Sequence, residues 1–295
     1  MNPRKFAAAL LGAWICLATS AIAADEKPHA IASLDAALLL HAPFDDTVDA
    51  ARAAGDPKLY TAPTGDRKAA QAGLPADNLV LHAKGEGKFG GALRFTTKMK
   101  PVVFFKGEKN LGYQPGNWTG SASLWLRLNP DQDLKPGYCD PLQFVAQAWG
   151  EGNMFIEFSK DHVPRHFRYA FLPVTKHWNP KGAAWEEIPE PQRPMVAVHQ
   201  PPFREDRWTH VAFTFGNINS GQKDGWGKLY LNGELQGETT GWDAVFHWDV
   251  TQSAVTLGLS YVGLLDDLAI FKRPLTDLEV KAIYQAPKGL SSILK

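Results

Sequence analysis

The sequence is poor in cysteine and carries no excess of charge. Its 295 residues include two cysteines and 31 basic residues against 31 acidic residues. Cys16 lies in the N-terminal leader described below, so Cys139 is the single thiol left and no intramolecular disulfide can form. We expect Cys139 to be buried as a small apolar residue. The balanced charge gives no electrostatic reason to expect nucleic acid or an anionic membrane as a partner.

Several catalytic and metal-binding signatures are also missing. The chain has no serine-hydrolase, phosphate-loop or dinucleotide motif, and the glycines of GKFGG at 87–91 fit a turn before a strand better than a phosphate cradle. Its histidines form no H-E-x-x-H motif and no Cys/His cluster, which argues against zinc. No internal repeat and no long helical period is found.

The N-terminus has the pattern of an export signal. Arg4 and Lys5 precede a short apolar run, and the sequence AIA at 21–23 is a small-x-small cleavage site. We expect 1–23 to be removed and the product to be exported to the periplasm or beyond the cell. An uncleaved anchor is the alternative, but the apolar run is shorter than the ~20 residues of a membrane span. We therefore expect no membrane insertion after removal of the signal.

Alternating polar and apolar residues predict strands along the rest of the chain. Leu124, Leu126 and Leu128 alternate with polar or exposed positions, and Val211, Phe213 and Phe215 do the same. Runs of this kind recur between glycine, proline and asparagine turns. The pattern favours antiparallel sheets with one face of each strand in a core.

One segment near the C-terminus is typical of a helix. Thr276 is a good N-cap, with Glu279 three residues later as the second half of a capping box. We expect Leu278, Val280 and Ile283 to anchor this helix on the rest of the protein.

Six motifs occur in an order that resembles the laminin G-like, concanavalin A-like jelly-roll domains of secreted bacterial proteins. They are LLLHAPFDDTVDA at 38–50, GKFGGALRF at 87–95, WTGSASLWLRLNP at 118–130, RWTHVAFTF at 207–215, GKLYLNGELQG at 227–237 and VTLGLSYVGLLDDLAIFKRPLTDLEVKAIY at 255–284. The resemblance implies an all-β, two-sheet antiparallel jelly-roll sandwich with a short C-terminal helix. It places one domain at 37–286, between a flexible lead-in at 24–36 and a tail at 287–295. Asn232-Gly233 is expected to form the tight turn of a hairpin.

A long insertion at 172–206 interrupts the strand pattern. It contains seven prolines, which remove backbone donors and disfavour regular pairing. It also contains Trp178, Trp185, Met195 and Phe203, whereas disordered segments are poor in large apolar side chains. A long loop of this kind in a compact domain favours a functional role.

Aromatic and polar side chains are expected to meet where this insertion covers a sheet. Flat rings stack on sugars, and carboxylate, guanidinium and imidazole groups bind hydroxyl or acidic groups. The candidate ligand-binding residues are Trp149, Glu157, His166, Arg168, His177, Trp178 and Trp185. Two simpler interpretations stay open: the rings fill the joint between insertion and sheet, and the charged residues form ordinary cross-strand pairs on a solvated face.

Glycosidase chemistry needs two carboxylates on either side of the scissile bond. The E-x-D-x-x-E pattern of jelly-roll glucanases is absent. Glu186 and Glu187 are adjacent and should diverge, and Glu151 lies six residues from Glu157, ~20 Å along an extended strand. The sequence therefore predicts a protein without catalytic activity.

Two pairs of aspartates suggest a structural calcium ion. In domains of the resembled type the first and last strands lie side by side, which would bring Asp45 and Asp46 towards Asp266 and Asp267. Four neighbouring carboxylates repel one another unless a cation joins them. Capping of turns by aspartate is the alternative.

We expect an exported binding module for a carbohydrate or glycoconjugate. One alternative is a structural or protein-interaction module of the cell envelope, with envelope proteins as partners. Another is a divergent glycoside hydrolase or polysaccharide lyase on the same fold.

Overall fold

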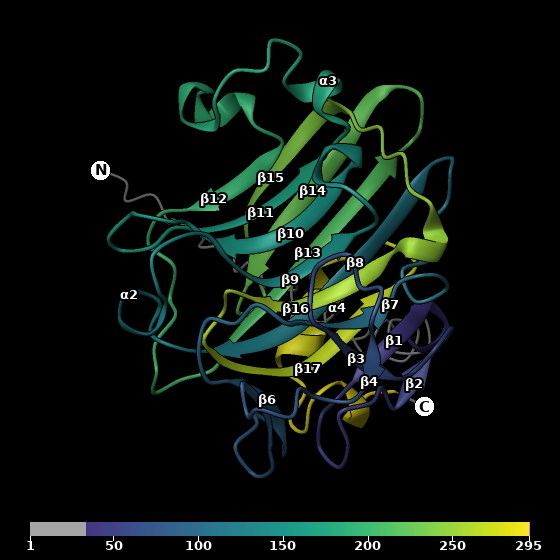
Figure 1. The fold of residues 1–295 in the computed structure, drawn as a ribbon. Helices are drawn as coiled ribbons and strands as arrows, with labels where there is room; N and C mark the ends of the chain where they lie inside the picture. Colours follow the sequence, from purple (N-terminus) through teal and green to yellow (C-terminus); the bar gives the residue numbers. More distant parts are fainter. Residues whose placement is uncertain (1–33, 295) are drawn as a thin grey trace, which may run out of the picture.

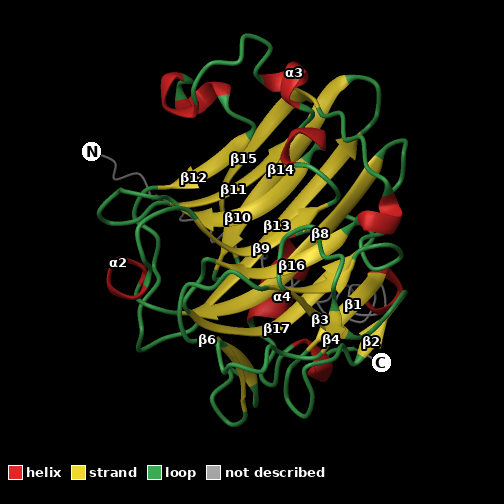
Figure 2. Ribbon diagram, in the orientation of Figure 1, coloured by secondary structure: helices red, strands yellow, loops and turns green. Residues whose placement is uncertain are grey.

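Strands dominate the computed structural model, which describes residues 34–294 (Figures 1 and 2). The described residues form two sheets, and all their strand pairs are antiparallel. In pairing order, the first sheet contains β15 (Glu234–Asp243), β14 (Lys223–Leu231), β13 (Thr209–Ile218), β8 (Trp118–Arg127), β17 (Gly263–Phe271), β1 (Leu38–Ala42) and β2 (Arg52–Ala53), with β6 (Ala92–Phe95) on β17 and β5 (Val80–Ala83) on β6. The second sheet contains β12 (Met195–Val198), β11 (Phe167–Leu172), β10 (Asn153–Phe158), β9 (Cys139–Val145), β16 (Ala254–Leu259), β7 (Val102–Lys106), β3 (Leu59–Ala62) and β4 (Gln71–Ala72). This confirms the predicted concanavalin A-like sandwich.

Short helices occupy the connections. They are α2 (Pro130–Asp133), α3 (Thr175–Trp178) and α4 (Asp277–Tyr284), with 3-10 turns η1 (Trp149–Glu151), η2 (Trp185–Glu187), η3 (Glu190–Gln192), η4 (Val250–Gln252) and η5 (Leu290–Ser292). Among the described residues, no helix has the length and apolar character needed to cross a membrane. The predicted signal at 1–23 lies outside the described residues.

The core lies between the two sheets and is filled by every second side chain. Leu124 of β8 lies opposite Val211 of β13, Ala122 lies opposite Phe213, and all four are buried. Cys139 is free and buried in the same core, as predicted, and desolvation raises its thiol pKa to about 11. Such a thiol is protonated and unreactive at neutral pH.

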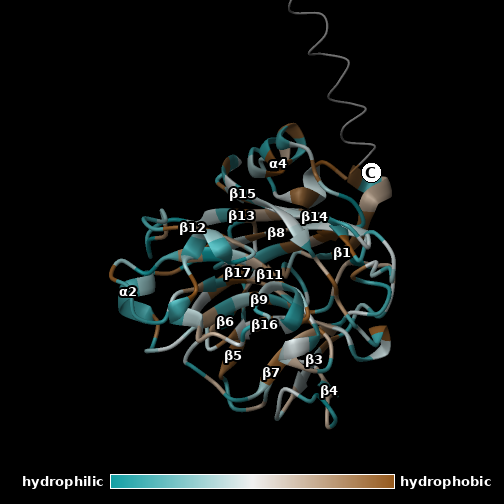
Figure 3. Ribbon diagram, turned by 90° about the horizontal axis from the view of Figure 1, so that it is seen from above, coloured by the Kyte–Doolittle hydropathy of each residue, from teal (hydrophilic) through white to brown (hydrophobic). Residues whose placement is uncertain are grey.

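The outer face of the first sheet is covered by α4, which Figure 3 shows lying across it. Thr276 caps this helix and Glu279 completes the capping box, as predicted. Val280 and Ile283 are buried against the sheet, but Leu278 is 67% exposed and the prediction that it anchors the helix is wrong. Two helical steps from Val280 rotate Leu278 by about 200°, onto the opposite side of the helix.

The packed domain extends beyond the predicted 37–286. Leu34 and Leu290 are both buried in the cluster beneath α4, so part of the expected lead-in and tail belongs to the folded unit. Asn232 and Gly233 have φ values of 51° and 79° and form the predicted hairpin turn between β14 and β15.

The insertion at 172–206 is more regular than its prolines suggest. Strand β12 pairs with β11 at the edge of the second sheet. It starts directly after Pro194 and ends before Pro201, so neither proline interrupts the ladder. The remaining residues include α3, at the top of Figure 1, and the turns η2 and η3. Trp178 of α3 and Trp185 of η2 pack on the outer face of this sheet.

Gly258 of β16 offers a test of the packing of the sandwich. Its φ is +69°, and an added Cβ would collide with the ring of Phe95. We predict that Gly258→Ala lowers the free energy of unfolding by about 2–5 kcal/mol, because backbone strain and overpacking add. Urea unfolding measures this, with Gly65→Ala as control because no atom lies within 4 Å of its added Cβ. Equal stability of the two variants would contradict the described packing.

Candidate functional site

A cleft of about 540 Å³ lies between the outer face of the second sheet and the insertion. Strands β9 and β10 supply its floor, and α3 and η2 of the insertion supply its roof. We call this space the roofed cleft. Trp149, Glu157, Trp178 and Trp185, four of the seven predicted ligand-binding residues, line it.

Three tryptophans form the apolar walls of the roofed cleft. Trp149 is 57% exposed and stacks on Phe155 at a centroid distance of 5.5 Å. Trp178 and Trp185 meet edge to face at 5.8 Å. These two rings also pack against a buried apolar group on the sheet that includes Phe155 and Met195. They therefore fill the joint between insertion and sheet and at the same time line the cleft.

The predicted pairing of Glu157 with Arg168 is present. β10 and β11 align Glu157 directly opposite Arg168, and the guanidinium Nη2 lies 2.5 Å from the carboxylate Oε1. The Arg168 guanidinium also lies 5.2 Å from the Tyr138 ring and 5.6 Å from the Trp185 ring. Both charged side chains are more than 90% buried, so this surface is covered by the insertion and is not the solvated face that the simpler interpretation assumes.

Asp140 is a floor residue that sequence reasoning missed. Between Ile156 and Phe158 of β10, the partner strand β9 runs from Leu142 to Cys139, so β9 carries one extra residue. The resulting bulge keeps Cys139 and Leu142 in the core and places Asp140 and Gln143 together in the roofed cleft. Strict alternation would have put Asp140 and Leu142 on the same face.

The cleft floor thus holds two buried carboxyls, and one of them pairs with the guanidinium of Arg168, which lines the adjoining depression. Desolvation is the largest cause of the raised pKa of Asp140, and the neighbouring Glu157 raises it further. Desolvation also raises the pKa of Glu157, while the Arg168 charge opposes that shift. Because Glu157 touches the cation and Asp140 does not, we assign the retained proton to Asp140, whose carboxyl accepts a hydrogen bond from Gln143 Nε2.

The two predicted histidines lie elsewhere. His177 Nδ1 pairs with Asp243 of β15 at 2.6 Å and does not line the roofed cleft. His166 lies in an adjoining depression that it shares with Arg168, Glu190 and Arg193. The alternation that placed Glu157 and Arg168 gives no information on His177, whose position depends on how the insertion folds.

The four aspartates predicted to bind calcium do come near one another. β1 pairs with β17, with Ala42 opposite Leu268, as the resemblance implied. Asp266 and Asp267 are buried, and burial together with the charge of Asp267 raises the pKa of Asp266 to about 8.

Their oxygens, however, already have other partners. Asp266 accepts hydrogen bonds from three backbone amides, those of Lys88, Phe89 and Asp267. Asp267 lies 2.7 Å from His41 Nε2 and accepts a hydrogen bond from the Leu290 amide. Asp45 accepts a hydrogen bond from Gly91, and the four carboxylates do not form a converging set among the described residues. This arrangement does not fit a calcium ion as it stands, and structural calcium stays a prediction.

Comparisons with known proteins agree with this fold. Residues 109–281 match the family profile of the Concanavalin A-like lectin/glucanases superfamily. Because this range is more than half of the chain, the protein belongs to that superfamily. A comparison with curated protein sequences finds no match.

Two solved structures illustrate the likeness in fold. Domain 4 of AbnA, a GH43 extracellular arabinanase from Geobacillus stearothermophilus solved with arabinotriose, is 17% identical with a TM-score of 0.51, over 84% of this chain and 98% of that domain. The botulinum neurotoxin serotype D ligand binding domain, solved with N-acetylneuraminic acid, is 12% identical with a TM-score of 0.55, over 88% of this chain. The match spans 53% of the neurotoxin domain. Binding modules and glycoside hydrolases share this fold, so the likeness identifies the fold alone.

The proton on Asp140 can be tested through stability. The folded carboxyl keeps its proton above the ordinary value of 3.8, where the unfolded chain has lost it, so wild-type stability falls as pH rises through that window. Asp140→Asn cannot titrate, and we predict that its stability relative to wild type increases between pH 5 and pH 8 by on the order of 1 kcal/mol or more. Denaturant unfolding at both pH values checks this. Parallel curves for the two proteins would contradict the assignment, and exposed Asp206→Asn is the control.

Proposed function

We propose that the roofed cleft binds a carbohydrate or the glycan of a glycoconjugate. The observation that carries the proposal is the joining of three tryptophan walls to a floor of two carboxyls and an amide in one cleft. The guanidinium of Arg168, in the adjoining depression, pairs with one of these carboxyls. Sugars need both surfaces, because their rings have apolar faces that stack on aromatics and hydroxyls that require hydrogen bonds. The volume of about 540 Å³ lies within the ~300–1,000 Å³ that is usual for ligand sites.

The polar floor supports this proposal because the burial of its charged groups adds little or nothing to the stability of the fold. Apolar side chains in place of a buried ion pair often leave a protein as stable or more stable. Arg168 also has a buried Nε without a hydrogen-bond acceptor among the described residues. A donor left unsatisfied in this way loses its water without compensation, which favours a role in binding over a role in stability.

Relatives in fold give general support. The AbnA domain and the neurotoxin domain are both solved with carbohydrate bound. An exported product fits such a ligand, and export rests on the predicted signal at 1–23. A role as an envelope protein-interaction module stays an alternative, although no feature of the described residues favours it specifically.

The aromatic walls give the direct test. We predict that Trp149→Ala and Trp178→Ala each weaken glycan binding by about tenfold or more, because a stacked indole at a binding site contributes more than about 1 kcal/mol. A glycan array identifies ligands for the mature protein, and calorimetry then compares the variants. Trp208→Ala is the control, because Trp208 packs on Ala83 and Leu264 away from the cleft. Unchanged binding by both cleft variants would remove the proposed site.

A second function, glycan cleavage, is favoured by the buried carboxyl pair. Burial raises the pKa of Asp140 well above its ordinary value and that of the neighbouring Glu157 to about 7, and acid and base catalysis uses carboxyls with pKa values raised in this way. From the sequence we predicted no catalytic activity, because the only candidate acid and base residues were pairs of glutamates.

Incubation of the protein with its array ligands tests this second function. If cleavage occurs, we predict that Asp140→Asn and Glu157→Gln each lower its rate by about 100-fold or more while both still bind the glycan. Chromatography of the products measures hydrolysis and elimination together. If the ligands are intact after incubation with wild-type protein, cleavage is contradicted and glycan binding is the remaining function.

A further inference from the structure

Three side chains that the sequence scatters converge beside the roofed cleft, at the edge of the second sheet. His166 precedes β11, and His199 follows β12. Because Phe167 pairs with Val198, the two histidines occupy the next opposed positions of this ladder. Their imidazole rings stack nearly parallel, at a centroid distance of 4.3 Å and an interplanar angle of 14°. Phe167 and Val198 face the core, so alternation directs both histidines to the outer face.

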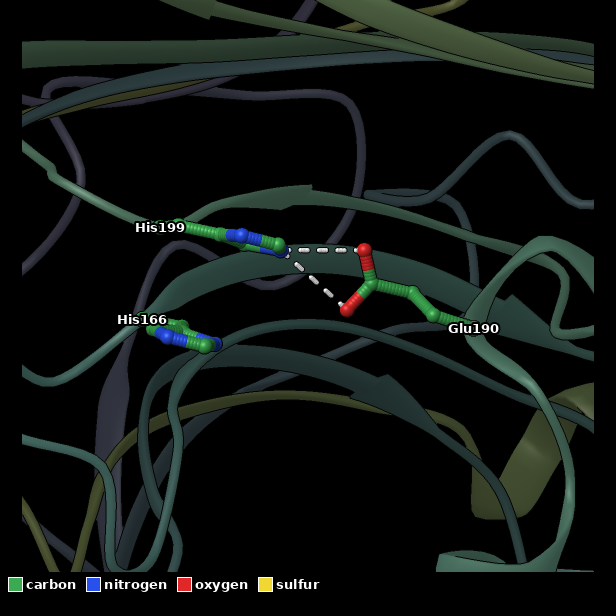
Figure 4. A group of neighbouring side chains, drawn as sticks. All are labelled: His166, Glu190 and His199. Carbon is green, nitrogen blue, oxygen red and sulfur yellow. Dashed lines mark hydrogen bonds and ion pairs between the residues drawn. The ribbon is translucent and has the colours of Figure 1, made fainter.

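Glu190 brings a carboxylate to this histidine pair from the insertion. Its two oxygens lie 3.0 and 3.3 Å from His199 Nε2, and Figure 4 shows the carboxylate facing the end of the His199 ring. One ligand atom from each of the three residues lies within 4.8 Å of the others. We refer to His166, Glu190 and His199 as the edge triad.

We propose that the edge triad binds a divalent transition-metal ion, with Zn²⁺ as its representative. Two imidazole nitrogens and one carboxylate oxygen are ligands that suit Zn²⁺ and its neighbours in the first transition row. They do not suit Ca²⁺ or Mg²⁺, which take oxygen ligands. This site is separate from the four aspartates and does not depend on the carbohydrate proposal.

The distances fit a metal after a small movement. With bonds of about 2.1 Å, a metal shared by His199 Nε2 and the nearer Glu190 oxygen, 3.0 Å apart, would have an angle of about 90° between them. The widest separation between two ligand atoms of the edge triad, up to 4.8 Å, would have to decrease when the metal binds. His199 and Glu190 are 58% and 42% exposed, so their side chains are free to rotate. His166 is held in place because His162 stacks on it at a centroid distance of 3.8 Å.

The position of the edge triad gives the metal a structural consequence. Glu190 lies in η3 of the insertion, whereas His166 and His199 flank the paired strands β11 and β12. A metal bound by all three would tie η3 of the insertion to the edge of the second sheet. Since a ligand that binds only the folded state stabilises it, we expect Zn²⁺ to raise the melting temperature.

Calorimetric titration of the mature protein with Zn²⁺ tests the proposal. The protein must carry no histidine tag, and the expected result is one ion per chain with a rise in melting temperature. His199→Ala and Glu190→Gln should each weaken Zn²⁺ binding at least about tenfold and reduce the thermal shift, since each removes a ligand. Both positions are exposed, so these variants should fold as wild type does in the absence of metal.

His247→Ala provides the matched control. His247 is also an exposed histidine next to a glutamate, Glu151, but it lies outside the edge triad. The His247→Ala variant should bind Zn²⁺ as tightly as the wild-type protein. Failure of wild type to bind Zn²⁺, or equal affinities of wild type and His199→Ala, would overturn the proposal. Both outcomes are independent of glycan binding, so they leave the function of the roofed cleft undecided.

Discussion

The burial of four sheet faces is the constraint on which the rest of this structure depends. The two inner faces bury each other, which the alternating apolar side chains of β8 and β13 make possible. The outer face of the first sheet is covered by α4 and the adjoining terminal residues. The outer face of the second sheet carries an apolar group around Phe155 and Met195, and the insertion covers it with Trp178 and Trp185. This last cover leaves a gap, and the roofed cleft is that space.

Incomplete cover also explains the chemistry of the cleft floor. The insertion removes water from Asp140, Glu157 and Arg168 without replacing it by a full set of hydrogen bonds. Burial of an ionised group without compensation is strongly unfavourable. Glu157 and Arg168 therefore form an ion pair, and the pKa of Asp140, which has no such partner, is raised. The raised pKa of Asp140 is therefore a consequence of the roof, and it needs no special feature of β9 beyond the bulge.

The parts of this arrangement that follow local periodicity could be predicted from the sequence. Alternation gave the core positions of β8 and β13, and the capping box gave the start of α4. The pairing of Glu157 with Arg168 depends on the register of β10 and β11, which alternation alone does not fix. The bulge that exposes Asp140 to the cleft could not be predicted, because a single extra residue reverses the face of its neighbours. The position of His177 depends on the path of an insertion with little periodicity. The edge triad escaped notice because its members are 24 and 9 residues apart and meet only through the pairing of β11 with β12.

The insertion links the roofed cleft to the edge triad because both use it. Its ion pairs with the rest of the protein are partly exposed: His177 pairs with Asp243, and Glu186 pairs with Lys160. Ion pairs of this kind contribute at most about 1 kcal/mol each, so aromatic packing supplies most of the attachment. A glycan between roof and floor and a metal at the edge triad would both favour the closed insertion. Under that condition each ligand must strengthen the binding of the other by the same factor, because coupling between two sites is reciprocal. The edge triad would then regulate the cleft without touching its ligand.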